Sequence, residues 1–327
     1  MGYIKFLVIK GSHTYDMSEL VESIKWGGRR GGAARSITVS LLDDDGYGHD
    51  RPGIDCEEGH QCIFYWKGEE LFRGLIVNNG QSNKKKMSVK AYDNGIYLAN
   101  NKDSFTYSNK TASAVFKDLM SRCKMTVDKV ADTGYVIPEL TKPKTTYFDV
   151  IADALSRTYK ATGKRYYVIS KGGKISLLKR TENMLQWVVE TGVNLIDYNY
   201  SISIEDTKTR IRLRTKKGKL LAEEVDSSLE KKIGIFQDVD TPDDSLNKAQ
   251  LKELVKSMLK SSGPTRKLTV SALGIPEAYS GMCIYIIIKE LGIKKTYYID
   301  EDTHTFKGNN HTMKLSLMLK SDINNTE

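Results

Sequence analysis

The chain has 327 residues, of which 39% are hydrophobic and 28% are charged, and its formal net charge is +9. This composition is typical of a soluble globular protein and excludes a disordered or fibrous one; at about 150 residues per domain, the length predicts two or three domains. No apolar run approaches the roughly 20 residues of a membrane helix, and the apolar patch at the start is too short for a signal peptide. We therefore expect synthesis in a cytoplasm and no membrane anchor.

The first hundred residues are predicted to form a small antiparallel barrel or sandwich. Apolar residues there alternate with polar ones, or form short runs bounded by glycine, aspartate and asparagine, as in short strands. Breaks are expected at Asp43–Gly46 and over the polar stretch Asn78–Lys85. The expected strands are Tyr3–Ile9, Ser36–Leu41, Gln61–Lys67, Leu71–Val77 and Lys86–Tyr92.

The segment Gly27–Gly32 shares only its glycine content with phosphate-binding loops. It lacks the lysine followed by serine or threonine, and no helix pattern follows it. Glycine-rich segments without that context are usually surface connections. We therefore interpret Gly27–Gly32 as a mobile basic loop.

Residues 101–196 are predicted to form a small α/β domain. Thr111 precedes a segment whose apolar residues recur at helical spacing, which makes it a candidate N-cap. Thr146 and Gly163 flank a second such segment, as N-cap and C-terminal glycine. Two strands are expected after it, Arg165–Ser170 and Lys174–Lys179, joined by a glycine turn.

The last third, residues 197–327, returns to β-structure and contains one helix. Thr241 and Pro242 are a capping threonine and a first-turn proline, so an inserted helix is expected over 242–262, ended by Gly263 and Pro264. The expected strands are Ile196–Ile204, Lys208–Thr215, Leu220–Val225, Arg266–Ala272, Met282–Ile288, Thr296–Asp300 and Thr312–Lys320.

Two segments, Gly59–Lys90 and Gly281–Leu317, resemble each other weakly. Each begins with a glycine-led strand containing Cys-Ile, continues through Glu-Leu, and includes a later strand that starts at methionine. Chance similarity between two β-meanders is one interpretation, because strand patterns are few. The other is that the first and last domains are two copies of one barrel.

Candidate metal and catalytic residues are few. Cys56, His60 and Cys62 lie close in sequence, but zinc needs four ligands and no second pair follows at suitable spacing; a buried strand cysteine and a loop histidine are the interpretation we favour. His304 and His311 flank a turn that would bring them together, without an obvious acid. Acidic residues that are adjacent in the sequence elsewhere would point to opposite faces of a strand, so we do not interpret them as a pair of catalytic carboxylates. We therefore predict no catalytic residue, no metal and no cofactor.

The strongest electrostatic feature is a basic strand in the last third. Strand spacing places its basic residues on one face and threonine, isoleucine and leucine on the other. One interpretation is a surface for phosphates, an acidic partner or a channel; the other is a solvated face paired with Glu223 and Glu224 on the returning strand. It lacks the stacking aromatics usual in nucleic-acid binders. The candidate residues are Lys208, Arg210, Arg212, Arg214 and Lys216.

Several segments in the same order resemble one known family. The sequence is similar to the XkdQ/YqbQ family of prophages and phage-tail-like particles, relatives of baseplate hubs of the late-control-protein-D type. The likeness covers nearly the whole chain, and its specificity comes from the order of the segments. These are Val21–Trp26 with Gly32–Val39, Gly59–Ile63 with Leu71–Gly74, Leu98–Ser104 with Asn109–Ala112, Val193–Ile196 with Ser201–Arg210, and Tyr297–Asp300 with His304 and His311–Leu317.

This resemblance implies a structural protein and not an enzyme. Hubs of this type are homotrimers with two tube-like β-barrel domains per subunit, so that a trimer presents six such domains to the hexameric tail tube and holds the trimeric spike on its other side. The implied fold is α+β and mainly β. Tube-like antiparallel barrels over 1–100 and 197–327 flank the α/β domain 101–196, and the helix 242–262 is an insertion in the last domain.

The resemblance also implies partners and a location. The partners are the tail tube protein, the spike protein, a LysM-bearing baseplate protein and a tape measure protein. The implied location is the baseplate of a contractile phage tail or phage-tail-like bacteriocin, made in the bacterial cytoplasm and released by lysis. Because the chain ends at Glu327 directly after its last expected strand, no fused hydrolase is expected.

Two other functions stay open at this point. A tail-associated peptidoglycan hydrolase fits the same context but has no paired catalytic residues in the sequence. A nucleic-acid-binding protein would use the basic strand 208–216 and the net charge of +9. We expect no sequence-specific nucleic-acid recognition.

Overall fold

The computed structural model describes residues 3–42, 56–82, 86–179, 184–242 and 246–318. The chain divides into two compact units, one made of residues 1–197 and 270–317 and the other centred on residues 198–269. The predicted break at Asp43–Gly46 lies outside the described residues. The α+β, mainly β fold class is confirmed, whereas the three-domain division stays a prediction.

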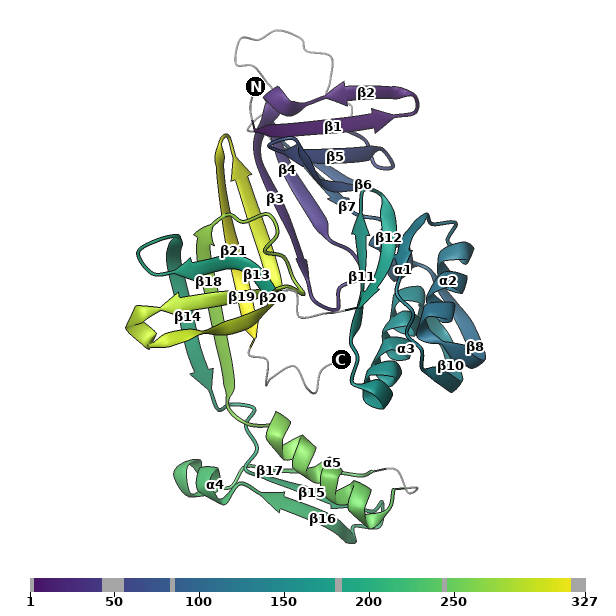
Figure 1. The fold of residues 1–327 in the computed structure, drawn as a ribbon, viewed down its shortest axis with the longest axis vertical. Helices are drawn as coiled ribbons and strands as arrows, with labels where there is room; N and C mark the ends of the chain where they lie inside the picture. Colours follow the sequence, from purple (N-terminus) through teal and green to yellow (C-terminus); the bar gives the residue numbers. More distant parts are fainter. Residues whose placement is uncertain (1–2, 43–55, 83–85, 180–183, 243–245, 319–327) are drawn as a thin grey trace. The chain divides into compact units, whose positions relative to one another are not determined.

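A long mixed sheet contains strands from both ends of the chain (Figure 1). Its N-terminal half consists of strands that surround one apolar core, which includes Phe6, Ile24, Val39, Phe64 and Val89. They are β1 (Ile4–Lys10), β2 (His13–Asp16), β3 (Val21–Arg29), β4 (Ser36–Leu42), β5 (Gln61–Trp66), β6 (Glu69–Ser82) and β7 (Lys86–Tyr92). A short 3₁₀ helix, Ser18–Leu20, precedes β3.

Two predicted loops in this half are wrong. Gly27, Gly28 and Arg29 belong to β3, so only the end of the glycine-rich segment is a turn. The stretch Asn78–Ser82 continues β6, and residues 83–85 lie outside the described part of the chain. Both segments are held as strands by pairing with distant neighbours, which overrides their weak local preference for β-structure.

The C-terminal half of the sheet repeats the neighbour order of the N-terminal half. The neighbouring strands are β1-β5-β6-β7-β4-β3 in one half and β13-β19-β20-β21-β18-β14 in the other. In each half, the first of these six strands along the chain pairs with the fourth, followed by the fifth, sixth, third and second, so that the two orders are the same. One difference is that β1 pairs antiparallel with β5, whereas β13 pairs parallel with β19. The strands are β13 (Met184–Glu190), β14 (Leu195–Ser203), β18 (Thr265–Leu273), β19 (Cys283–Ile288), β20 (Ile293–Lys307) and β21 (Asn310–Met318).

The weak sequence similarity falls on corresponding strands of the two halves. Cys62 lies in β5 and Cys283 in β19, and Met87 and Met313 lie in β7 and β21; all four side chains are buried. The Glu-Leu pair at Glu290 lies in a 3₁₀ helix, Lys289–Leu291, before β20. The two halves join where β20 pairs antiparallel with β3, from Phe306 opposite Ile24 to Glu301 opposite Arg29.

The middle of the chain forms its own apolar core within the first unit, where α2 and α3 lie against a two-stranded sheet of β8 and β10 (Figure 1). Both predicted helices are confirmed, with Thr111 and Thr146 as N-caps and Gly163 at the end of α3 in the left-handed conformation. A second sheet has the order β11-β12-β9. The elements are α1 (Gly95–Asn100), β8 (Lys102–Thr111), α2 (Ala112–Arg122), β9 (Val127–Val130), β10 (Val136–Thr146), α3 (Tyr147–Thr162), β11 (Tyr166–Lys171) and β12 (Lys174–Lys179).

We expect Thr146→Ala to lower the free energy of unfolding by about 1 kcal/mol. The Thr146 hydroxyl accepts a hydrogen bond from the backbone N–H of Asp149 at 3.0 Å, and alanine leaves that donor without its partner. Thr146→Ser keeps the hydroxyl and is the control. Chemical denaturation checks the prediction, and equal midpoints for the two variants would contradict it.

The second unit contains a three-stranded sheet with the order β16-β15-β17 (Figure 1). Ile211 and Leu213 of β15 pack against Leu251 and Val255 of α5 in a small core. The elements are β15 (Arg210–Arg214), β16 (Leu220–Val225), α4 (Ser227–Ile233), β17 (Gln237–Asp240) and α5 (Lys248–Ser261).

The predicted helix over 242–262 is correct in type but begins six residues later. Asn247 is the N-cap of α5, in a capping box with Gln250, and this local arrangement prevails over the Thr241-Pro242 signal. Thr241 and Pro242 are not helical, and residues 243–245 are not described. In its described residues, the segment between β14 and β18 therefore holds three strands and two helices, and not a helix alone.

Candidate functional site

The predicted basic strand is shorter than expected, but its alternation is as predicted. Arg210, Arg212 and Arg214 lie in β15 and are half-buried on one face, while Ile211 and Leu213 are buried on the other. Lys208 and Lys216 lie outside the strand. The structure thus brings three of the five candidate residues together.

Acidic side chains compensate much of the charge on this face. Arg210 forms ion pairs with Glu230 at 2.9 Å and Glu223 at 3.5 Å, and Arg212 forms one with Glu223 at 3.3 Å. Arg214 donates a hydrogen bond to the carbonyl oxygen of Gly218. Glu224 is opposite Ile211 in the antiparallel register and follows Glu223 in β16. Because adjacent strand residues point to opposite faces, Glu223 lies on the face of the arginines and Glu224 on the other face. A role of this face in binding a partner stays a prediction.

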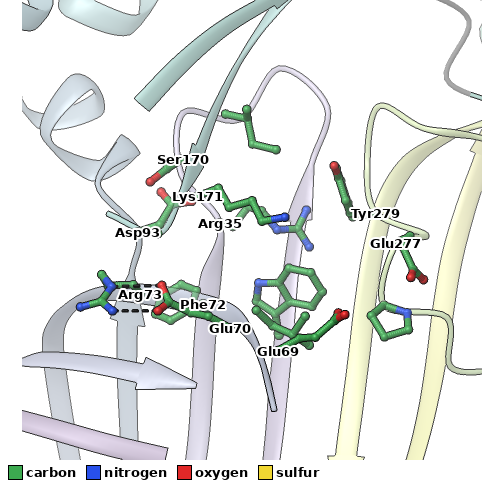
Figure 2. Close-up of a pocket in the computed structure, with 15 residues that line it drawn as sticks. Arg35, Glu69, Glu70, Phe72, Arg73, Asp93, Ser170, Lys171, Glu277 and Tyr279 are labelled. Carbon is green, nitrogen blue, oxygen red and sulfur yellow. Dashed lines mark hydrogen bonds and ion pairs between the residues drawn. The ribbon is translucent and has the colours of Figure 1, made fainter. Parts of the chain in front are cut away.

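The first unit contains a cavity of about 420 Å³ that the sequence did not predict. Its walls come from β6, from the hairpin of β11 and β12, and from the connections that follow β3, β7 and β18. Figure 2 shows Arg73 and Glu70 joined by two hydrogen bonds at one side of the cavity, with Tyr279 and Glu277 at the other. The Arg73–Glu70 bonds leave neither side chain as an isolated charge.

The most perturbed acid in the cavity wall is Asp93. Its side chain is buried, and burial raises the pKa of its carboxyl group to about 7. One carboxyl oxygen accepts the backbone N–H of Gly95 at 2.9 Å, at the start of α1. The backbone N–H of Asp93 donates to the carbonyl oxygen of Arg35. Asp93 thus connects the start of α1 with the segment at Arg35. Near neutral pH its carboxyl group is protonated in a fraction of the molecules.

We expect Asp93→Asn to raise the free energy of unfolding by about 1–2 kcal/mol at pH 8, because the folded protein no longer holds a buried carboxylate there. The raised folded pKa means that the contribution of Asp93 is fully present below the unfolded value of 3.8 and is lost as the pH rises through about 7. Asparagine keeps the acceptor for Gly95. Denaturation of both proteins between pH 5 and 8 tests this, and parallel stability curves would contradict it.

The predicted hairpin does bring His304 and His311 together. Nδ1 of His304 lies 2.9 Å from Nε2 of His311, and Nε2 of His304 lies 3.1 Å from the carbonyl oxygen of Ala278. The acid that the sequence did not reveal is Asp302, whose carboxylate is 3.5 Å from Nε2 of His304. His304 is fully buried, whereas His311 is half-buried. Burial lowers the pKa of His304 to about 4 and that of His311 to about 3.

Arg35 and Asp302 form a buried ion pair beside the histidines. Two guanidinium nitrogens of Arg35 donate to the two carboxylate oxygens of Asp302, one at 3.0 Å, and the backbone N–H of Ser280 donates to one of those oxygens. The guanidinium carbon of Arg35 lies 4.3 Å from the ring centroid of Trp26. This cluster lies next to the β3–β20 pairing and ties the two halves of the sheet together.

Sequence reasoning missed Arg35, Asp93 and Asp302. Arg35 lies in the segment Gly32–Val39, which carries no signal for a site beyond the family resemblance. Asp302 alternates with His304 along β20, which places the two side chains on one face. That alternation was the one available signal. In the described residues, no group of three or more His, Cys, Asp or Glu side chains is arranged so that it could hold a metal ion. None of the helices in these residues is long and apolar enough to span a membrane.

The comparisons with known proteins agree with this fold. The YQBQ-like family model matches residues 24–318. The chain is 38% identical to YqbQ of Bacillus subtilis strain 168 and 36% identical to XkdQ of the phage-like element PBSX of the same strain, each time over 98% of both chains. It is also similar to the crystal structure of a 43 kDa tail protein of prophage MuSo2 from Shewanella oneidensis, with a TM-score of 0.76, 12% identity, and coverage of 97% of this chain and 98% of that one. The chain therefore belongs to the YqbQ-like family and has the fold of a phage tail protein.

Proposed function

We propose that this protein is the structural hub of the baseplate of a contractile phage tail or phage-tail-like bacteriocin. In this role three copies form a trimer that joins the hexameric tail tube to the trimeric spike. Membership of the YqbQ-like family and the likeness to a prophage tail protein support the tail context. No enzymatic activity is part of this function.

The observation that carries the proposal is the repeated strand order in the long sheet. Each half has the same sequence of neighbours, so a trimer would present six similar modules. Closed symmetry requires each contact surface to meet a complementary one on the next subunit, and six similar modules suit a sixfold tube. We infer that the two halves are the tube-like barrels predicted over 1–100 and 197–327, that the second barrel also includes β13 from the end of the predicted middle domain, and that the rest of 101–196 lies between them in the chain.

The proposed partners follow from this position in the tail. They are the tail tube protein on one side, the spike protein on the other, and a LysM-bearing baseplate protein and a tape measure protein nearby. The protein would be made in the bacterial cytoplasm and leave the cell by lysis within the particle.

We expect the purified protein to be a trimer of its 36.8 kDa subunit, either alone or within the complex that it forms with the tube or spike protein. A permanent trimer should bury roughly 2,000 Å² or more at each contact, enough to survive dilution. Size-exclusion chromatography with light scattering measures this mass. A monomer in all three conditions would contradict the trimeric hub.

A tail-associated peptidoglycan hydrolase is the second candidate. The cavity with its buried Asp93 favours it, because a carboxyl group with a pKa of about 7 suits a general acid. The test is clearing of a cell-wall suspension by the purified protein. Clearing that Asp93→Asn abolishes, while the variant stays folded, would favour the hydrolase.

A further inference from the structure

We propose that the cavity in the first unit binds an organic cation, that is, an ammonium or guanidinium group carried on an alkyl stem. The cavity has a volume of about 420 Å³, and sites for small molecules commonly have roughly 300–1,000 Å³. The ligand is separate from the tube and spike proteins, and the inference does not depend on the trimeric hub. It follows from the charges, the rings and the unpartnered polar atoms of the cavity wall.

Most charged groups at the wall already have a partner. Glu70 accepts two hydrogen bonds from Arg73, at 3.0 and 2.7 Å. The guanidinium of Arg35 is paired with the carboxylate of Asp302. Burial raises the pKa of the Asp93 carboxyl group to about 7, so that this group carries only part of a charge near neutral pH. These groups together therefore contribute little net charge to the cavity.

Two carboxylates in the wall are left unpaired. Glu69 lies at the start of β6 and Glu277 in the connection between β18 and β19; both are exposed, and neither forms an ion pair within the described residues. Figure 2 shows them on the same side of the cavity, below Tyr279, with Lys171 above them. Of the basic side chains in the wall, Lys171 alone lacks an acidic partner in the described part of the chain. The excess of unpaired carboxylates makes this side of the cavity negative, which attracts a cation.

The apolar part of the wall suits a cation on an alkyl stem. The guanidinium carbon of Arg35 lies 4.3 Å from the ring centroid of Trp26 and 5.4 Å from that of Tyr279. The protein thus already places one cation against these two rings, whose negative faces stabilise it. Leu71 and Pro276 belong to the same wall and would contact the stem. Such surroundings fit an organic cation better than a hard metal ion, which prefers a shell of oxygen ligands.

Two buried polar atoms of the wall narrow the ligand further. They are Nε1 of Trp26, a residue that is 5% exposed, and the hydroxyl oxygen of Ser170; the described residues offer a hydrogen-bond partner to neither. Buried polar groups are rarely left unsatisfied, and an indole N–H can only donate. A ligand that also carries a carbonyl oxygen would supply an acceptor. A lysine or arginine residue of a peptide has both groups, so we expect it to bind more tightly than a simple amine.

A bound cation would connect the two halves of the long sheet. Glu69 belongs to the N-terminal half and Glu277 to the C-terminal half. The Arg35–Asp302 pair already connects the same halves, and Arg35 lines the cavity. Because a ligand that binds only the folded protein shifts the unfolding equilibrium, the cation should raise the melting temperature as its concentration increases.

Three compounds test the class of ligand, each titrated calorimetrically into the full-length chain at neutral pH and low salt. N-acetyl-lysine methylamide carries the cation and carbonyl groups. The corresponding norleucine compound has the same stem without the ammonium group, and cadaverine has the stem and ammonium groups without a carbonyl. We expect the lysine compound to bind about tenfold or more tightly than the norleucine compound, because only the former makes hydrogen bonds between charged groups.

Variants at exposed positions test the residues. Glu69→Gln and Glu277→Gln keep the size of the side chain and remove its charge, and each should weaken binding of the lysine compound about threefold to fivefold. Glu19→Gln, at an exposed position outside the cavity wall, is the matched control and should bind as the wild type does. Lys171→Met removes the unpaired ammonium and should tighten binding of cadaverine about twofold. Equal melting temperatures without ligand would show that the variants are folded.

Several outcomes would overturn the proposal. The cavity is not a cation site if the lysine compound does not bind at millimolar concentration, if the norleucine compound binds equally well, or if Glu69→Gln/Glu277→Gln binds the lysine compound as tightly as the wild type. Weaker binding of cadaverine to Lys171→Met would indicate recognition of an anion and would also overturn it. Cadaverine binding as tightly as the lysine compound supports a site for free amines, and weaker binding of cadaverine supports a site for a basic residue of a peptide. The mass of the assembly is measured separately, so that failure of this inference leaves the trimeric hub standing.

Discussion

Arg35→Met should lower the free energy of unfolding by about 3–5 kcal/mol, the loss expected when one partner of a buried ion pair is removed. Asp302 is fully buried and accepts two guanidinium hydrogen bonds from Arg35. Methionine fills similar space but leaves the carboxylate with only the Ser280 N–H and the nearby His304. The variant also loses the contact of the guanidinium with the Trp26 ring. Thermal or chemical denaturation at pH 7 measures the loss.

Lys86→Met is the matched control for this prediction. Lys86 and Glu22 form an ion pair whose side chains are 43% and 31% exposed, and such pairs contribute about 1 kcal/mol or less. The double variant Arg35→Met/Asp302→Asn should recover part of the loss, because no uncompensated charge stays buried. Equal effects of Arg35→Met and Lys86→Met would show that the buried pair does not hold the sheet halves together.

Lowering the pH from 7 to 4 should destabilise the protein by roughly 3 kcal/mol through His304. Its pKa is about 4 in the folded protein against a usual value of 6.5, because burial disfavours the charged imidazolium. The unfolded chain therefore binds more protons between these values. The contribution of His304 is fully present above pH 6.5 and is lost as the pH falls towards 4. His311, whose pKa is lowered to about 3, acts in the same direction.

The His311→Phe variant tests this dependence. Phenylalanine can join the ring cluster of Phe306 and Trp66, which lie 4.1 Å and 5.7 Å from the His311 ring centroid, but it carries no titrating group. Between pH 6.5 and 4 its stability should fall less steeply than that of the wild type, whatever its stability at pH 7. Because Asp93 titrates in the opposite sense over part of this range, both proteins are best compared in the Asp93→Asn background. Identical slopes there would contradict a contribution of His311 to the pH dependence.

The candidate site was only partly accessible to sequence reasoning. The turn between His304 and His311 is local, so their approach could be predicted from a hairpin. The pairing of Arg35 with Asp302 joins residues 267 positions apart, and no pattern within either segment points to it. Asp93 directly follows the predicted strand Lys86–Tyr92, and nothing in that segment indicates the burial that raises the pKa of its carboxyl group.

Local features of this protein could be predicted from its amino-acid sequence. Thr111, Thr146 and Gly163 define the ends of their helices because caps act through hydrogen bonds and backbone angles within a few residues, and alternation assigned the faces of β15. Long-range pairing, in contrast, makes Gly27–Arg29 and Asn78–Ser82 strands and brings strands from opposite ends of the chain into one sheet. These features could not be predicted locally because β-pairing satisfies backbone N–H and C=O groups with partners that are distant in sequence. A polar or glycine-rich segment therefore becomes a strand when a neighbouring strand offers its edge.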